Sequence, residues 1–233
     1  MPSLFDLSRL TFDEFVSFFF DHDIATEGHW YENPDFDNLN DFDDEGVASP
    51  LVVVEHMARL FTNFAEVASK FSLEQINAAI WAMFTYGSFR LQKHLWLPSV
   101  PLQRRLECIR SMYFVYSEYV AKSTVPVMEN CFSMWWDFVA SGFWEQFIGK
   151  IKDGDVAALN GGQRALLDAM FETLSKILDL PDERTQGYAL HGLGHLHHPG
   201  VPQLVQQFLD QHRHKMAADG VRWVEMCRDG TVM

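Results

Sequence analysis

The sequence predicts an all-α protein, an irregular α-solenoid of packed helical hairpins. Its 233 residues are 48% hydrophobic and 14% aromatic, a core-forming composition that excludes wholesale disorder. From residue 50 onward, apolar residues recur at helical spacing, and the breaks between the runs carry capping residues. No part of this body shows the alternation of apolar and polar residues that is typical of strands.

The helices follow from their start and stop signals. Thr11-Phe-Asp-Glu14 and Ser72-Leu-Glu-Gln75 are capping boxes, in which the first and fourth residues exchange side-chain and backbone hydrogen bonds. The first predicts a helix over about residues 12–20, and the second a helix to about residue 95. Proline and glycine separate the others, which we expect over about residues 50–70, 101–122, 126–148, 182–197 and 201–216, with one more ending at Pro181.

Negative charge is concentrated at the start of the chain. The formal net charge is −14, and residues 1–45 hold 13 of the acidic residues but a single base, Arg9. From residue 22 to residue 50 the helical periodicity fails, which indicates a long loop. We therefore expect three parts: an acidic N-terminal segment (1–48) packed on the body, a helical body (49–216) and a C-terminal tail (217–233).

The composition narrows the classes of function. Binding nucleic acid directly requires clustered Lys and Arg, and this chain has 18 against 32 Asp and Glu. The longest apolar run, residues 15–20, is far shorter than the ~20 residues that a membrane helix needs. No secretory leader is visible. The three widely spaced cysteines, Cys108, Cys131 and Cys227, are expected to be buried and suit a reducing compartment, so we expect a cytoplasmic location.

Residues 184–210 resemble one HEAT repeat, with a first helix, a turn at His198-Pro-Gly200 and a second helix from Val201. The apolar face of the first helix consists of Ala189, Leu190, Leu193 and Leu196. Gly187 and Gly194 lie on another face, where we expect the missing side chains to let a neighbouring helix approach. Residues 189–195 together with Met134-Trp-Trp-Asp137 also resemble a set of uncharacterised bacterial helical proteins, a resemblance that implies a fold but no activity.

The acidic segment suggests a binding function. Residues 21–45 contain ten acids and no Lys or Arg, and such a field attracts cationic surfaces and speeds association. We predict a non-catalytic protein that engages a protein partner with a basic surface; one specific version is an immunity-type inhibitor of a bacterial toxin. The candidate contact residues are five loop aspartates and three aromatic anchors: Asp35, Asp37, Asp41, Asp43, Asp44, Trp30, Tyr31 and Trp136.

A pair of histidines supports an alternative. His191 and His195 are one helical turn apart, a spacing with which helical histidines bind zinc. The spacing indicates no third ligand, and Asp137 and Glu172 are the two residues that the fold could bring to the pair. Motifs for phosphate loops, dinucleotide binding, nucleophile elbows and zinc proteases do not occur, which argues against an enzyme. The alternatives are therefore a metal-binding protein or metal-dependent enzyme centred on this pair, and a general helical scaffold. The leading hypothesis requires no cofactor.

Overall fold

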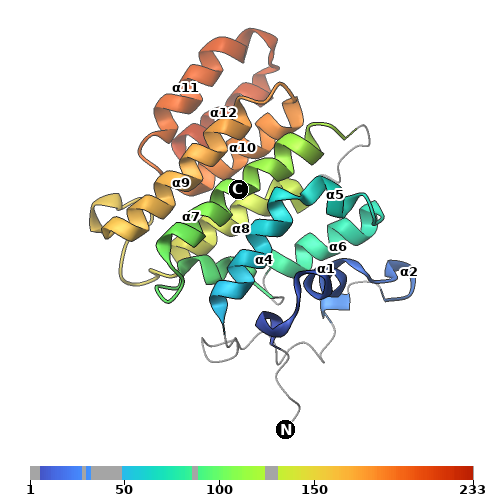
Figure 1. The fold of residues 1–233 in the computed structure, drawn as a ribbon. Coiled ribbons are helices and arrows are strands. Elements are labelled where there is room, and N and C mark those ends of the chain that lie inside the picture. Colours follow the sequence, from blue (N-terminus) through green and yellow to red (C-terminus); the bar gives the residue numbers. More distant parts are fainter. Residues whose placement is uncertain (1–5, 28–29, 33–48, 86–88, 124–130, 233) are drawn as a thin grey trace. The chain divides into compact units, whose positions relative to one another are not determined.

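A computed structural model describes residues 6–27, 30–32, 49–85, 89–123 and 131–232 (Figure 1). Its regular elements are helices, and no strand occurs in these described ranges. The predicted all-α class is therefore confirmed. No helix in the described part of the chain is both long enough and apolar enough to cross a membrane. The chain divides into two compact units, Met1–Tyr119 and Val120–Met233, and each is described by itself.

The first unit is built on helices that bury aromatic and aliphatic faces. Its elements are α1 (Phe12–Phe20), α2 (Ile24–Glu27), α4 (Pro50–Thr62), α5 (Phe64–Ala68), α6 (Leu73–Phe84), α7 (Leu102–Phe114) and the short 3₁₀ helices η2 (Trp30–Glu32) and η4 (Leu91–Trp96). The main packing pairs are α4 with α7 and α1 with α6. Both predicted capping boxes are present, at Thr11 and at Ser72. They fix the starts of α1 and α6, the two helices that frame the site described below.

Several predicted helices are shorter than expected. The helix expected to reach residue 95 ends at Phe84, and η4 follows after Arg90, whose φ of 48° is left-handed and interrupts helical geometry. The helix expected over 101–122 ends at Phe114 and continues as one π-helical turn, Val115–Val120. The 3₁₀ helix η4 and the π-helical turn are each six residues long. Over so few residues, the apolar spacing of these helices cannot be distinguished from that of an α-helix.

The second unit is organised around one central helix. Its elements are α8 (Cys131–Glu145), α9 (Gly161–Leu178), α10 (Glu183–Leu196), α11 (Val201–His212) and α12 (Ala218–Asp229). Helix α10 packs mainly against α8 and α9, and also against α12. All four residues of its predicted apolar face are at most 2% exposed. Helix α12 occupies the segment that we expected to be a C-terminal tail, and it packs on α10 and α11.

The glycines of α10 have different surroundings. A Cβ on Gly192 would overlap the Cβ of Trp136 in α8, so this glycine permits close packing of α8 and α10. A Cβ on Gly194 would overlap Val232 and lie 3.2 Å from the Cα of Cys227 in α12, which confirms the approach of a neighbouring helix predicted there. The same prediction for Gly187 is wrong, because nothing lies within 4 Å of its Cβ position.

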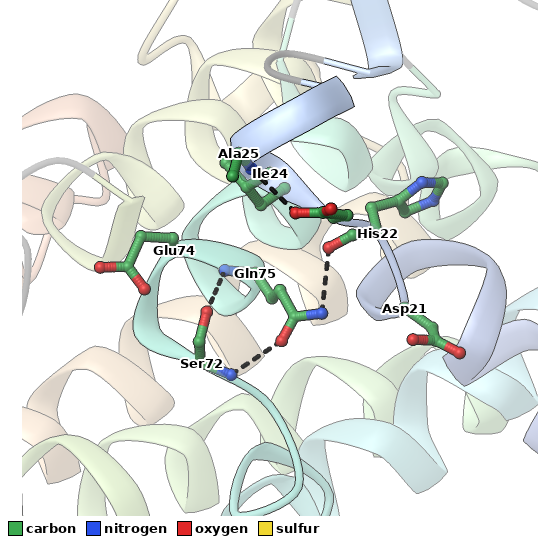
Figure 2. Close-up of a pocket in the computed structure, with 8 residues that line it drawn as sticks. Asp21, His22, Ile24, Ala25, Ser72, Glu74 and Gln75 are labelled. Carbon is green, nitrogen blue, oxygen red and sulfur yellow. Dashed lines mark hydrogen bonds between the residues drawn. The ribbon is translucent and has the colours of Figure 1, made fainter.

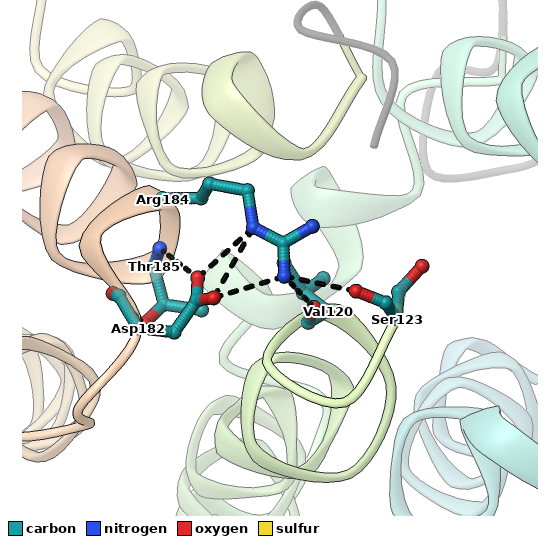
Figure 3. Close-up of polar contacts among 5 residues, drawn as sticks. All are labelled: Val120, Ser123, Asp182, Arg184 and Thr185. Atoms are coloured by element: carbon teal, nitrogen blue, oxygen red, sulfur yellow. Dashed lines mark hydrogen bonds and ion pairs between the residues drawn. The ribbon is translucent and has the colours of Figure 1, made fainter. Parts of the chain in front are cut away.

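Arg184 fastens the start of α10 to the segment before α8 (Figure 3). Its Nη2 donates to the carbonyl oxygens of Val120 and Ser123, at 2.9 and 3.1 Å, and its Nε donates to the Asp182 carboxylate at 3.2 Å. Asp182 also caps α10 by accepting from the Thr185 backbone N–H at 3.1 Å. Partial burial acts to raise the pKa of Asp182, but the hydrogen bonds from Arg184 and Thr185 outweigh it, and the pKa is lowered. The cap is therefore charged at neutral pH.

Candidate functional site

An acidic pocket of about 600 Å³ lies in the first unit, between the segment after α1 and the start of α6 (Figure 2). We call it the acidic pocket; its lining consists of Asp21, His22, Asp23, Ile24, Ala25, Ser72, Glu74 and Gln75. Three of these residues carry carboxylates and none is Lys or Arg. The pocket thus presents concentrated negative charge beside an apolar patch formed by Ile24 and Ala25.

The capping box of α6 holds the two walls of the pocket together. The Ser72 backbone N–H donates to Gln75 Oε1 at 2.9 Å, and the Gln75 N–H donates back to Ser72 Oγ at 3.2 Å. Gln75 Nε2 then donates to the carbonyl oxygen of His22 at 3.0 Å. One side chain therefore completes the α6 cap and also ties down the segment after α1 (Figure 2).

His22 anchors the opposite wall. Its Nδ1 lies 2.7 Å from Glu27 Oε2, and its Nε2 lies 2.8 Å from the carbonyl oxygen of Phe18. The imidazole stacks on Trp30 with ring centroids 3.8 Å apart. The hydrogen bond to His22, with a further one from the Asp23 backbone, lowers the pKa of Glu27. These contacts fix residues 22–27 over the aromatic core.

Two carboxylates of the pocket are open to a ligand. The Asp21 side chain is exposed and has no hydrogen bond or ion pair with any described residue. Glu74 is also exposed, and hydrogen bonds from its own backbone N–H and from Ser72 lower its pKa. Asp23 is partly engaged, because its Oδ1 accepts from the Ala25 N–H at 3.1 Å. A cation entering the pocket therefore meets exposed carboxylates from both α1 and α6.

The predicted contact residues fall into two groups. The five loop aspartates, Asp35, Asp37, Asp41, Asp43 and Asp44, lie outside the described residues. The three aromatic anchors are in the interior: Trp30 is 4% exposed, Tyr31 is 7% exposed and Trp136 is fully buried. Trp30 packs against Phe18 and Phe89, with ring centroids 5.7 and 6.2 Å apart. These three side chains stabilise the fold and present little surface to a partner.

The histidines singled out in the sequence form a polar chain in the second unit. His191 Nδ1 lies 3.1 Å from the carbonyl oxygen of Ser133, and His191 Nε2 lies 3.1 Å from His195 Nε2. His195 Nδ1 is 3.5 Å from Asp137, which also accepts from the Ser141 hydroxyl at 2.8 Å. The structure thus brings His191, His195 and Asp137 together.

The three contacts of His191 and His195 need three N–H protons, whereas two imidazoles with one proton each supply two. Each of the three contacts made by His191 and His195 joins two atoms that can both be acceptors, so each needs one N–H between them, whereas a neutral imidazole carries one proton. Burial lowers the pKa of His195, with the Asp137 carboxylate acting in the opposite direction. With one proton on each ring, one of the three contacts lacks an N–H.

Among the described residues, no three His, Cys, Asp or Glu side chains are grouped so that they could hold a metal ion. Each Nδ1 of His191 and His195 nevertheless faces an oxygen acceptor, as is common for histidines that bind metal ions. The two Nε2 atoms are thereby turned toward each other.

Fold and site together define an all-helical protein with an acidic pocket in one unit and a histidine pair in the other. Comparison with known proteins finds no matching family model, no matching curated protein and no matching solved structure.

Proposed function

We propose that this chain is a non-catalytic binding protein whose acidic pocket receives a cationic side chain from a basic protein partner. The observation that carries the proposal is the composition of the pocket: carboxylates of Asp21, Asp23 and Glu74 line about 600 Å³, with no Lys or Arg among the lining residues. A carboxylate that is left without a partner in a concave site favours a bound ammonium or guanidinium group.

The surrounding charge supports the same partner chemistry. The pocket begins at Asp21, where the run of ten acids without a Lys or Arg also begins. The long-range field of that run would raise the association rate for a basic surface, while the pocket would supply a specific contact. Arg fits best, because its planar guanidinium can bridge two carboxylates at once. A nuclease toxin, with a phosphate-binding and hence basic cleft, would be one partner of this kind.

We also propose that the second unit is assembled from HEAT-like hairpins. The support is the pair α10 and α11, which are joined by a turn at residues 197–200, together with the buried apolar face of α10. In the proposed array, α10 also packs on α8 and α9, so each hairpin would contact its neighbours as stacked repeats do.

An oligoarginine peptide is a suitable probe for the acidic pocket, with its affinity measured by fluorescence anisotropy. The combined substitution Asp21→Asn and Glu74→Gln should weaken binding by ~3–10-fold, because each lost surface ion pair is worth ~0.2–1 kcal/mol. The matched control, Glu66→Gln with Asp179→Asn, removes the same charge from exposed positions that do not line the pocket. Equal losses in the two double variants would show that only net charge matters and would contradict the proposal.

Divalent metal binding by His191 and His195 is a second candidate. If each Nδ1 carries its proton, Ser133 and Asp137 are both satisfied, and the two Nε2 lone pairs face one position between them. A metal ion there would supply the electropositive atom that two singly protonated rings lack, with water completing the coordination.

Titration of the metal-free protein with zinc, followed by calorimetry, tests this candidate. Binding that is lost in His195→Gln and retained in His212→Gln would support it. If both variants give the same heat of binding, the zinc binds to other groups on the surface.

A further inference from the structure

A second cavity lies in the second unit, among α10, α11 and α12. Its volume is about 260 Å³, roughly nine times the ~30 Å³ that one water occupies in the liquid. Its apolar wall consists of Leu190, Phe208, Met216, Trp223 and Val224. Leu190 and Val224 are 2% exposed and Phe208 is 8% exposed, so the wall is continuous with the core. The cavity therefore has an apolar wall anchored in the core and space for a small ligand.

Two helical glycines leave this space open. Nothing lies within 4 Å of the Cβ position of Gly187, the fifth residue of α10, and the nearest atom to that of Gly220 in α12 is Met216 Cβ at 4.0 Å. Glycine inside a helix lowers its stability relative to alanine. Gly192 and Gly194 have a packing reason for this cost, because a Cβ on either would overlap a neighbour. At Gly187 no described neighbour needs the space of the missing side chain, and the residue lines the cavity.

One acidic and one basic side chain, both without a partner among the described residues, also line the cavity. Glu183 at the start of α10 and Lys215 after α11 both line it and both are exposed. Neither side chain has an ion pair or hydrogen bond with the residues that the structure describes, and the same holds for the indole N–H of Trp223. An apolar wall flanked by an unpaired carboxylate and an unpaired ammonium is complementary to a small amphipathic zwitterion.

We propose that this cavity binds a free α-amino acid with an apolar side chain. In that complex Glu183 receives the ligand's ammonium group, Lys215 receives its carboxylate, and the side chain packs on Leu190 and Phe208. The volume suits leucine or phenylalanine, and free glycine would leave the apolar wall uncovered. The inference is independent of the acidic pocket, which lies in the other unit and recognises cations alone.

The test is a titration of the ¹⁵N-labelled full chain with L-leucine and L-phenylalanine, following the indole N–H signal of Trp223. Saturable shifts are expected for both ligands and not for free glycine. Gly187→Leu should fill the space and weaken binding by at least ~10-fold, the scale of discrimination by fit in an apolar pocket. Gly161→Leu is the matched control, since a Cβ on this α9 glycine also meets nothing within 4 Å.

Charge recognition is tested separately with Lys215→Gln, a change at an exposed residue that should not affect folding. This variant should bind L-leucine several-fold more weakly, and N-acetyl-L-leucinamide, which lacks both charges, should bind the natural chain more weakly than L-leucine does. The proposal is overturned if no apolar amino acid gives a saturable shift up to ~10 mM. It is also overturned if Gly187→Leu binds as the natural chain does, or if the uncharged derivative binds as well as the free amino acid.

Discussion

The Cβ of Trp136 in α8 occupies the space that a side chain on Gly192 of α10 would need. Trp136 is fully buried, and Leu174 of α9 lies 3.0 Å from the same position. The backbone of α10 therefore sits directly against a tryptophan, and glycine is the one residue that permits this contact without a shift.

Gly192→Ala should lower the free energy of unfolding by about 1–3 kcal/mol, because overpacking at this contact forces α8 and α10 apart. Gly187→Ala, five residues earlier in the same helix, should instead raise it by about 0.5–1 kcal/mol, because its Cβ meets nothing and alanine favours the helix. Urea unfolding of both variants measures the difference. An unchanged free energy of unfolding in Gly192→Ala would show that the α8–α10 contact is loose.

His94 should make the first unit sensitive to acid. This imidazole is 3% exposed, its Nδ1 has no hydrogen-bond partner among the described residues, and burial lowers its pKa from 6.5 to about 3. Between these two pH values the unfolded chain binds a proton that the folded chain excludes, so stability falls as the pH drops. The loss from pH 7 to pH 5 should be about 2 kcal/mol for this group.

The measurement is urea unfolding at pH 7 and at pH 5 for the natural chain and for His94→Leu. The variant should lose about 2 kcal/mol less between the two pH values than the natural chain does. His198, whose pKa is also lowered mainly by burial, adds a loss of the same sign in both proteins. An unchanged pH dependence in His94→Leu would mean that His94 is charged or solvated in the folded state.

Arg184 should stabilise the start of α10 through the two carbonyl groups that it binds (Figure 3). Arg184→Met removes both hydrogen bonds and the pairing with Asp182, and should cost about 1–3 kcal/mol. Hydrogen exchange of the amides near Val120 and Ser123 should accelerate in this variant. Arg222→Met, which breaks only an exposed pair with Asp219, is the control and should cost less than about 1 kcal/mol. Equal effects of the two substitutions would contradict the role given to Arg184.

The three cysteines should be inert in the folded protein. All are at most 2% exposed, and burial raises the pKa of Cys131 and of Cys227 to about 12 and that of Cys108 still further. Because the thiolate is the reactive form, iodoacetamide at pH 8 should leave all three unmodified in mass spectra until urea is added. Rapid labelling of any one thiol in the native protein would show that its surroundings open readily.

The start of a helix could be predicted from the sequence where the signal for it lies within a few residues. The capping boxes at Thr11 and Ser72 set helix starts that the structure confirms, because a cap depends on four consecutive residues. Helix ends were harder: Arg90 adopts a left-handed conformation for which its sequence gives no signal. Helix α12 was missed because only Val224 and Cys227 along it are buried, too few for a clear apolar stripe.

None of the described residues that line the acidic pocket was among the contact residues named from the sequence, because the two walls of the pocket are distant in sequence. Asp21 and Asp23 belong to the acidic run that the sequence marked, whereas Glu74 joins them through the contact between Gln75 and His22. Glu74 gave no sign of a binding role in the sequence, because acidic residues in the first turn of a helix stabilise the helix itself. Trp30 was named from the sequence as an anchor for a partner, but its burial depends on neighbours such as Phe89, which is 59 positions later in the chain.

The central claim is that the acidic pocket holds the cationic group of a partner, and NMR shift mapping with the oligoarginine peptide tests it most directly. The account predicts that the largest backbone amide shifts fall on residues 21–25 and 72–75, and that Asp21→Asn with Glu74→Gln reduces them. Shifts that gather instead around His191 and His195, with residues 21–25 and 72–75 unchanged, would contradict it.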